Sequence, residues 1–144
     1  MIAAVFDTNV VVSGVLAPDG TPGKLLDAIL DGVCQPAVTD SILAEYEDVL
    51  SRPKFRLPVS KVRLFLKAFR SRAVRAPFAP VTHSELLPDP DDVIFLEAAM
   101  GLDIPIVTGN ARHFPRSIAG RVEVLSPAAF LARLSVPSDE KAGR

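Results

Sequence analysis

Apolar residues occur along the chain in short runs and stripes that are separated by proline, glycine and charged residues. A continuous apolar run at residues 2–6 ends directly at Asp7, and it predicts a strand buried on both faces, as in parallel sheets. Residues 9–15 continue this run with interruptions, and the pattern assigns no separate element to them. Further strands are predicted at residues 33–38, 73–80, 104–107 and 122–125.

Stripes with a period of three to four residues predict helices between these strands. The predicted helices cover residues 24–30, 40–50, 59–72, 91–100 and 128–134. Asp89 is expected to cap the fourth of them, with Pro90 at its first position and Gly101 at its end. Strands that alternate with helices are typical of an α/β fold in which helices cover both faces of a parallel sheet.

The composition of the chain excludes several classes of protein. The 144 residues fit one domain with its own core, and 16 Lys and Arg nearly balance 17 Asp and Glu, so net charge indicates no partner. One cysteine and two histidines exclude a disulfide framework and a Cys/His zinc site, and they favour the reducing cytoplasm. The chain lacks a signal peptide pattern and an apolar run of the roughly 18 residues that a membrane span needs, so no membrane partner is expected. We expect one domain over residues 1–134 and a flexible tail over 135–144.

Three acidic side chains are predicted to meet at one edge of the sheet. Asp7 follows the first strand directly, and ligands of open α/β sheets bind beyond the carboxyl ends of the strands. Glu45 lies beside the apolar stripe of its helix, and Asp92 lies on the packing side of a largely apolar helix, where a carboxylate needs a partner. A capping role for Asp7 and a solvated position for Glu45 are the simpler alternatives.

Three converging carboxylates need compensation. At separations of about 5 Å and an effective dielectric constant of ~20, their mutual repulsion amounts to roughly 10 kcal/mol. Proton uptake or a bound divalent cation relieves it, and oxygen ligands select hard ions such as Mg²⁺ or Mn²⁺. Thr8 and Asn9, which follow Asp7, are expected to hold its carboxylate in place.

Positive charge is concentrated in the middle of the chain. Residues 51–84 contain no acidic residue and nine basic ones, and Arg63, Lys67 and Arg70 are spaced to line one helix face away from the apolar face. A basic stripe beside an acidic metal site suits a nuclease, because cations hold the phosphates of the substrate. The predicted RNA-binding residues are Arg52, Lys54, Arg63, Lys67 and Arg70. A solubilising surface helix is the alternative.

Four segments, taken in order, resemble the PIN-domain family over about residues 2–134. They read FDTNV, then ILAEY with VLSRPKF, then PDPDD with FLEAA, and finally IVTGN with HF. Each segment alone is a weak signal, whereas four in the expected order are specific. Within the family, the chain looks most like the VapC-like toxins of bacterial type II toxin–antitoxin pairs.

The resemblance implies a Rossmann-like, three-layer α/β/α sandwich with a central parallel sheet. It further implies an endoribonuclease that depends on Mg²⁺ or Mn²⁺ and cleaves phosphodiester bonds of single-stranded or structured RNA. A homodimer and a cognate antitoxin protein are implied as partners. The family pattern places the catalytic and metal-binding carboxylates at Asp7, Glu45 and Asp92.

One position departs from the family pattern. Asn110 stands where many members have an aspartate, and it is expected to join the metal ligands through its carbonyl oxygen, with Thr108 in support. His113 is expected to form a hydrogen bond near this turn. The uncharged Asn110 also supports an alternative, a catalytically weak PIN-like module that binds RNA or protein. A phosphatase of the aspartyl-phosphate type is disfavoured, because it needs an aspartate at the position of Asn9.

Overall fold

A computed structural model describes residues 2–135 of the chain. Five strands form one sheet in the order β3-β2-β1-β4-β5, and all neighbouring strands are parallel. The strands are β1 (Ile2–Phe6), β2 (Cys34–Val38), β3 (Val74–Arg75), β4 (Ile106–Val107) and β5 (Val124–Leu125). The five predicted strands are therefore confirmed, although β3, β4 and β5 are shorter than the apolar runs that predict them.

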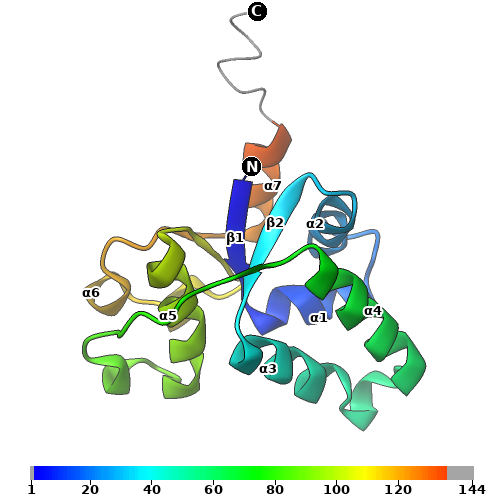
Figure 1. Ribbon diagram of the computed structural model, residues 1–144, viewed down its shortest axis with the longest axis horizontal. Coiled ribbons are helices and arrows are strands. Elements are labelled where there is room, and N and C mark those ends of the chain that lie inside the picture. Colours follow the sequence, from blue (N-terminus) through cyan, green and yellow to red (C-terminus); the bar gives the residue numbers. More distant parts are fainter. Residues whose placement is uncertain (1, 136–144) are drawn as a thin grey trace, which may run out of the picture.

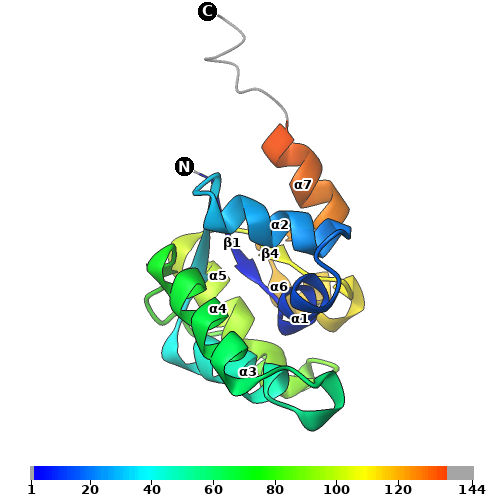
Figure 2. The same cartoon turned by 90° about the vertical axis from the view of Figure 1, so that its right-hand side faces the viewer.

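Seven α-helices surround the sheet in the described residues. They are α1 (Thr8–Leu16), α2 (Thr21–Leu30), α3 (Asp40–Leu50), α4 (Val59–Ser71), α5 (Val93–Leu102), α6 (Arg116–Ala119) and α7 (Pro127–Ser135). Figure 1 shows α1 and α2 on one side of the sheet and α5 and α6 on the other, and Figure 2 views the side that carries α2. The predicted α/β/α sandwich with a central parallel sheet is confirmed. None of the helices in residues 2–135 is long and apolar enough to cross a membrane.

The pattern along the chain misses one long element, α1. Its valines at positions 10, 11 and 12 are all buried, and its exposed face carries two polar residues, Asn9 and Ser13, and then Leu16, so the polar stripe is too short to reveal the period. Valine is also a weak helix former, and burial against the rest of the fold outweighs that preference. Helix α2 begins at Thr21, three residues before its predicted start, because Pro22 is tolerated in the first turn.

The start of the fourth predicted helix is confirmed, whereas its predicted end is wrong. A short 3₁₀ helix, η3 (Pro90–Asp92), leads into α5, and the Asp89 carboxylate caps it by accepting a hydrogen bond from the Asp91 amide at 3.1 Å. Gly101 lies inside α5, which ends at Asp103 in the left-handed conformation with φ of 54°. The predicted tail lies outside the described residues except for Ser135, which is the last residue of α7.

Gly101 has a packing role instead, and this gives a testable prediction. A Cβ atom at this position would lie 2.1 Å from the carbonyl oxygen of Pro77, which is a backbone atom. We expect Gly101→Ala to lower the free energy of unfolding by about 1–3 kcal/mol. In a helix without this close approach, the same change would raise stability by about 1 kcal/mol. The sign of the change in the free energy of unfolding, measured by urea denaturation, therefore shows whether Gly101 has this packing role or is an ordinary helix position.

Candidate active site

Asp7 lies at the carboxyl end of the central strand, where the order of the strands reverses. The chain passes from β1 outward to β2 and β3, and then returns to place β4 on the other side of β1. The crevice outside the ends of β1 and β4 is the usual ligand position in such sheets. Asp7 is 5% exposed, and its amide donates to the carbonyl oxygen of Val107 on β4 at 2.9 Å.

Two hydrogen bonds fix the Asp7 carboxylate. The Thr8 amide donates to Oδ1 at 2.8 Å, which makes Asp7 the cap of α1, and the Thr108 hydroxyl donates to Oδ2 at 2.7 Å. The capping interpretation of Asp7 is therefore correct. It does not exclude a functional role, because a carboxylate at this position also faces the crevice.

The turn after β4 is tied to the turn after β1. Thr108 Oγ1 accepts a hydrogen bond from the Asn110 amide at 3.0 Å, and Asn9 Oδ1 accepts one from the Gly109 amide at 3.1 Å. Thr108 therefore contacts the Asp7 carboxylate, whereas Asn9, which is expected to hold that carboxylate, holds the turn after β4 instead. Thr8 contributes its backbone amide, while its buried Oγ1 has no hydrogen-bond partner in the described part of the chain.

Asp92 enters the same crevice from the start of α5. It is 9% exposed, and its Oδ2 lies 3.0 Å from Nδ1 of His113 in the 3₁₀ helix η4 (Ala111–His113). The predicted hydrogen bond of His113 near this turn is confirmed. The contact joins the β4 turn to α5 and leaves the second oxygen of the carboxylate free of the imidazole.

The pKa shifts of the acidic side chains indicate which of them lie near one another. The pKa of Asp92 is raised to about 6; burial is the largest cause, the charges of Asp7 and Asp89 also raise it, and the hydrogen bond and charge of His113 oppose them. Burial also raises the pKa of Asp7, against the hydrogen bonds from Thr108 and Thr8. Asp7 and Asp92 therefore form a pair of buried, mutually repelling acids, and Asp89 lies close enough to affect both.

Glu45 lies at the edge of this group. It is half-buried on α3, and its pKa is raised by burial first and then by Asp48, while Asp91 and Asp89 raise it further. The residue after it, Tyr46, is fully buried, and its hydroxyl donates to the carbonyl oxygen of Phe6 at the end of β1. This bond fixes α3 against the crevice. Glu45 thus lies toward η3. The charge of Asp89 raises the pKa of Glu45 as well as those of Asp7 and Asp92.

The carboxylate oxygens of the crevice are the kind of ligand that a hard divalent cation prefers, but they are few. In residues 2–135, no three His, Cys, Asp or Glu side chains are placed to hold a metal ion together. Mg²⁺ nevertheless usually binds through one or two carboxylates and keeps several waters, so the two buried acids Asp7 and Asp92 are sufficient. A cation would also relieve their repulsion. The side chain of Asn110 forms no hydrogen bond in the described residues, and it is half-buried.

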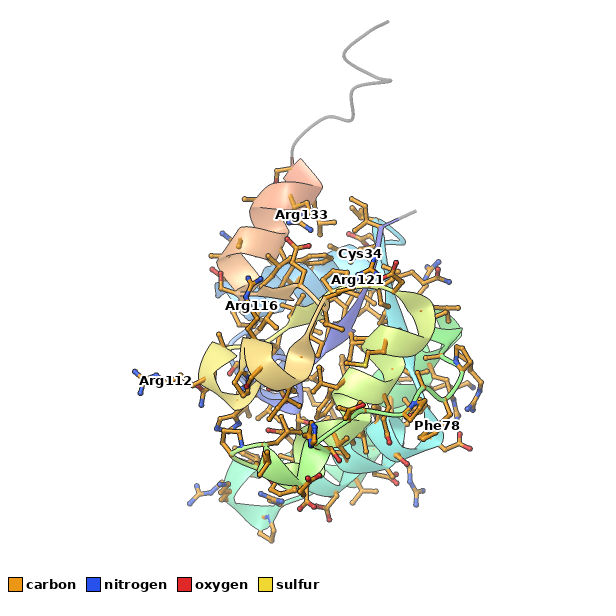
Figure 3. All side chains as sticks on the ribbon, turned by 90° about the vertical axis from the view of Figure 1, so that its left-hand side faces the viewer. Cys34, Phe78, Arg112, Arg116, Arg121 and Arg133 are labelled. Carbon is orange, nitrogen blue, oxygen red and sulfur yellow. The ribbon has the colours of Figure 1, made fainter. Side chains whose placement is uncertain are left out.

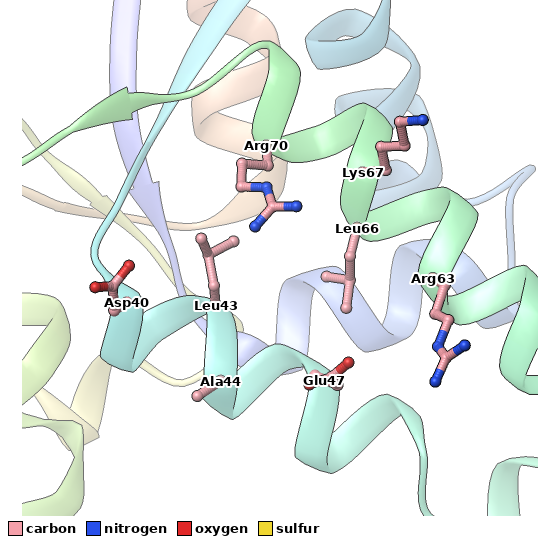
Figure 4. A pocket seen from close by; sticks show the side chains of 8 residues that line it. All are labelled: Asp40, Leu43, Ala44, Glu47, Arg63, Leu66, Lys67 and Arg70. Carbon is pink, nitrogen blue, oxygen red and sulfur yellow. The ribbon is translucent and has the colours of Figure 1, made fainter.

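The predicted basic stripe does not lie beside these acids. Arg63, Lys67 and Arg70 line a groove of about 500 Å³ between α3 and α4, with Leu66 (Figure 4). The opposite wall belongs to α3 and carries Asp40, Leu43, Ala44 and Glu47. Glu45 faces η3 from a different side of α3, so the stripe and the acidic crevice lie on different faces of this helix. The expectation that they adjoin is wrong, because the sequence shows a helix face but not which neighbour it meets.

The two other predicted RNA-binding residues follow α3. Arg52 forms an exposed, 3.4 Å ion pair with Asp48, four residues earlier on α3. Lys54 belongs to η1 (Pro53–Phe55), and its Nζ lies 5.0 Å from the centre of the Phe55 ring. Among the basic residues 52–75, Arg52 is the one that lies close enough to Glu45 to lower its pKa.

The raised pKa of Asp92 predicts that the metal-free protein loses stability as pH rises from about 4 to about 7. The folded state binds the Asp92 proton up to pH of about 6, whereas the unfolded chain releases it near about 3.9. Stability that the proton provides at low pH is therefore lost as pH rises, by about 3 kcal/mol. Urea denaturation in chelator checks this. Asp92→Asn should gain stability over wild type as pH rises, and a constant difference would contradict the assignment.

Comparison with known proteins identifies the family. The PIN domain model matches residues 3–112. The chain is also 32% identical to the uncharacterized protein MJ1680 of Methanocaldococcus jannaschii over 110 residues, which are 76% of this chain and 71% of that protein. The chain belongs to the PIN domain family. PIN domains are generally nucleases, and PIN nucleases usually use divalent metals.

Two solved structures share the fold. One is VapBC2 from Rickettsia felis bound to a DNA fragment from their promoter, with a TM-score of 0.59, 15% identity, and coverage of 87% of this chain and 98% of that chain. The other is FitAB bound to an IR36 DNA fragment, with a TM-score of 0.57, 19% identity, and coverage of 88% and 95%. At these identities the likeness supports the three-layer sandwich and the order of its elements.

Proposed function

We propose that the protein is an endoribonuclease that depends on Mg²⁺ or Mn²⁺, and that it is the toxin of a toxin–antitoxin pair. The observation that carries the proposal is the pair of buried carboxylates, Asp7 and Asp92, at the carboxyl ends of β1 and β4 in a PIN domain. Two buried acids that repel one another, with His113 as the partner of Asp92 alone, cost free energy, and such sites are typically functional. RNA is the substrate that the VapC-like motifs indicate.

Each side chain has a distinct part in this proposal. Asp7 and Asp92 hold the cation, with Glu45 and Asn110 as further oxygen donors at the edge of the crevice. When bound, the cation lowers the pKa of a water molecule and offsets the charge of the scissile phosphodiester. Thr108 and the Thr8 amide keep Asp7 in one orientation, and His113 does the same for Asp92.

A cleavage assay tests the proposal. Purified protein is incubated with a panel of RNAs that includes tRNA, in Mn²⁺, in Mg²⁺ and in chelator. We expect cleavage in either metal that leaves a 5′-phosphate and a 3′-hydroxyl, and none in chelator. If the full panel stays intact in Mn²⁺, the endoribonuclease proposal is wrong.

The alternative is a PIN domain that binds RNA or a protein without cleaving. Two observations favour it: the uncharged Asn110, and the lack of a three-residue metal cluster in the described residues. RNA binding that is unchanged in chelator, together with a fold that Mg²⁺ does not stabilise, would support this alternative over the nuclease.

The partners proposed for the chain are an antitoxin and a second copy of itself. The groove between α3 and α4 offers an antitoxin segment an apolar floor, at Leu43 and Leu66, between walls of opposite charge. Co-expression with the product of a short neighbouring reading frame, followed by light scattering, tests both partners. We expect a complex that inhibits cleavage, a homodimer of the free toxin, and residence in the cytoplasm with the RNA substrate.

A further inference from the structure

A second group of basic residues lies in the last quarter of the chain, outside the central basic stretch. Between residues 109 and 135, Glu123 is the one acidic residue, while Arg112, Arg116, Arg121 and Arg133 are basic. Figure 3 shows these four arginines on one face of the molecule, with Arg112 projecting outward. This segment therefore has an excess of positive charge that the net charge of the chain conceals.

Arg112 belongs to the turn that orients Asp92, and Arg116 follows that turn at the start of α6. Arg112 precedes His113 in η4, and His113 lies 3.0 Å from the Asp92 carboxylate. Arg116 begins α6 after Pro115, and it borders a hollow of about 360 Å³ that also touches Ala111 in η4. Arg112 thus lies in the turn that contacts Asp92, and Arg116 lies four residues further along the chain at the rim of this hollow.

These two arginines are also available to a ligand. Both are exposed, and neither forms an ion pair within residues 2–135. The single acid of residues 109–135 is paired, because Nη1 and Nη2 of Arg133 donate to the Glu123 carboxylate at 2.8 and 2.7 Å. By contrast, Lys67 and Arg70 line a groove whose other wall, on α3, carries Asp40 and Glu47. A polyanion is therefore attracted to Arg112 and Arg116 without an opposing carboxylate.

We propose that Arg112 and Arg116 hold successive phosphates of a single-stranded RNA as it leaves the acidic crevice over η4 and α6. The inference rests on the proposed endoribonuclease function, and it assigns the substrate path to a face that the predicted stripe of α4 does not include. Guanidinium groups pair with phosphates through two parallel hydrogen bonds, so arginine suits this role better than lysine. The scissile phosphate would then lie beside Asp7 and Asp92.

Binding of a labelled single-stranded RNA of about 20 nucleotides, measured by fluorescence anisotropy in chelator, tests the path. We expect Arg112→Ala/Arg116→Ala to bind about 10–30-fold more weakly near ~0.1 M salt, and to reduce the slope of log K against log salt by about 1.4. The comparison variant Lys67→Ala/Arg70→Ala removes the same charge from the α4 stripe that the sequence predicts to bind RNA, and its loss of affinity should be smaller than that of the Arg112/Arg116 variant. Thermal unfolding should be the same for all three proteins.

The outcomes separate this inference from the proposed function. If wild type binds RNA and the Arg112/Arg116 variant binds equally well, the path is wrong while the nuclease proposal stands. A larger loss in the Lys67/Arg70 comparison variant would assign the RNA to α4 and also overturn the path. If the variant loses binding to duplex DNA but not to RNA, the face serves another polyanion. Wild type that neither binds nor cleaves RNA overturns both proposals.

Discussion

Asp7→Asn is expected to reduce RNA cleavage by more than about 100-fold, because it removes one of the two buried charges that we propose hold the cation. Loss of groups that only orient a metal ligand typically costs about 10–100-fold, so loss of a ligand charge should cost more. Steady-state cleavage of one RNA in Mn²⁺, compared between wild type and the variant, measures the effect. Activity within about 10-fold of wild type would show that Asp7 is not a metal ligand.

The stability of the same variant separates a lost ligand from a damaged fold. Asparagine caps helices as well as aspartate does, and the change removes a charge that burial disfavours. Asp7→Asn should therefore melt at the same or a higher temperature than wild type in chelator. Asp7→Ala is the matched control, because it also loses the cap of α1 and should lose about 1 kcal/mol. Both variants should be inactive, while Asp7→Ala should be less stable.

The second large effect is stabilisation by the cation itself. At a Mn²⁺ concentration of about 100 times the dissociation constant, a single site raises the free energy of unfolding by about 2.7 kcal/mol. For a chain of this length, that corresponds to a rise in melting temperature of about 5–10 °C. We expect the rise in wild type and its loss in Asp7→Asn and Asp92→Asn, as measured by differential scanning fluorimetry.

The control for this experiment is an acid outside the crevice. Asp31 lies at the end of α2, on an exposed turn, and Asp31→Asn should respond to Mn²⁺ as wild type does. An equal rise in all variants would mean that Mn²⁺ binds elsewhere on the chain. No rise in wild type would favour the alternative of a binding module.

Much of the fold follows from local patterns in the chain. The run at residues 2–6 is apolar at every position because β1 is central and covered on both faces, and this pattern is visible without a structure. Helix α1 is different: it is buried on most sides, so its period is hidden and its valines disfavour helix. Burial by the rest of the fold forms this helix, and a local pattern does not carry that information.

The sequence predicts the acids of the site, but it does not predict which other side chains lie next to them. Asp7 ends a strand and Asp92 starts a helix, so topology alone places both at the same edge of the sheet. The sequence predicts that Asp89 is a cap, and this is confirmed. Its closeness to Asp7, Asp92 and Glu45 depends instead on the path of η3, which a local pattern does not reveal.

The positive charges illustrate the same limit. The run of residues 51–84 without acids is conspicuous in the sequence, yet α4 turns its basic side toward Asp40 and Glu47. Arg112 and Arg116 form no run, and a low density of acids between residues 109 and 135 is the one signal that points to them. Which charges meet a substrate is decided by packing over long distances in the chain.

Anomalous diffraction at the manganese absorption edge, from crystals grown or soaked in Mn²⁺, tests the central claim most directly. That claim is that Asp7 and Asp92 together bind a divalent cation at the carboxyl ends of β1 and β4. The account predicts a strong anomalous peak within coordination distance of both carboxylates, which disappears in Asp7→Asn. Crystals of the same protein with no peak between these two side chains, or with manganese bound only elsewhere, would contradict it.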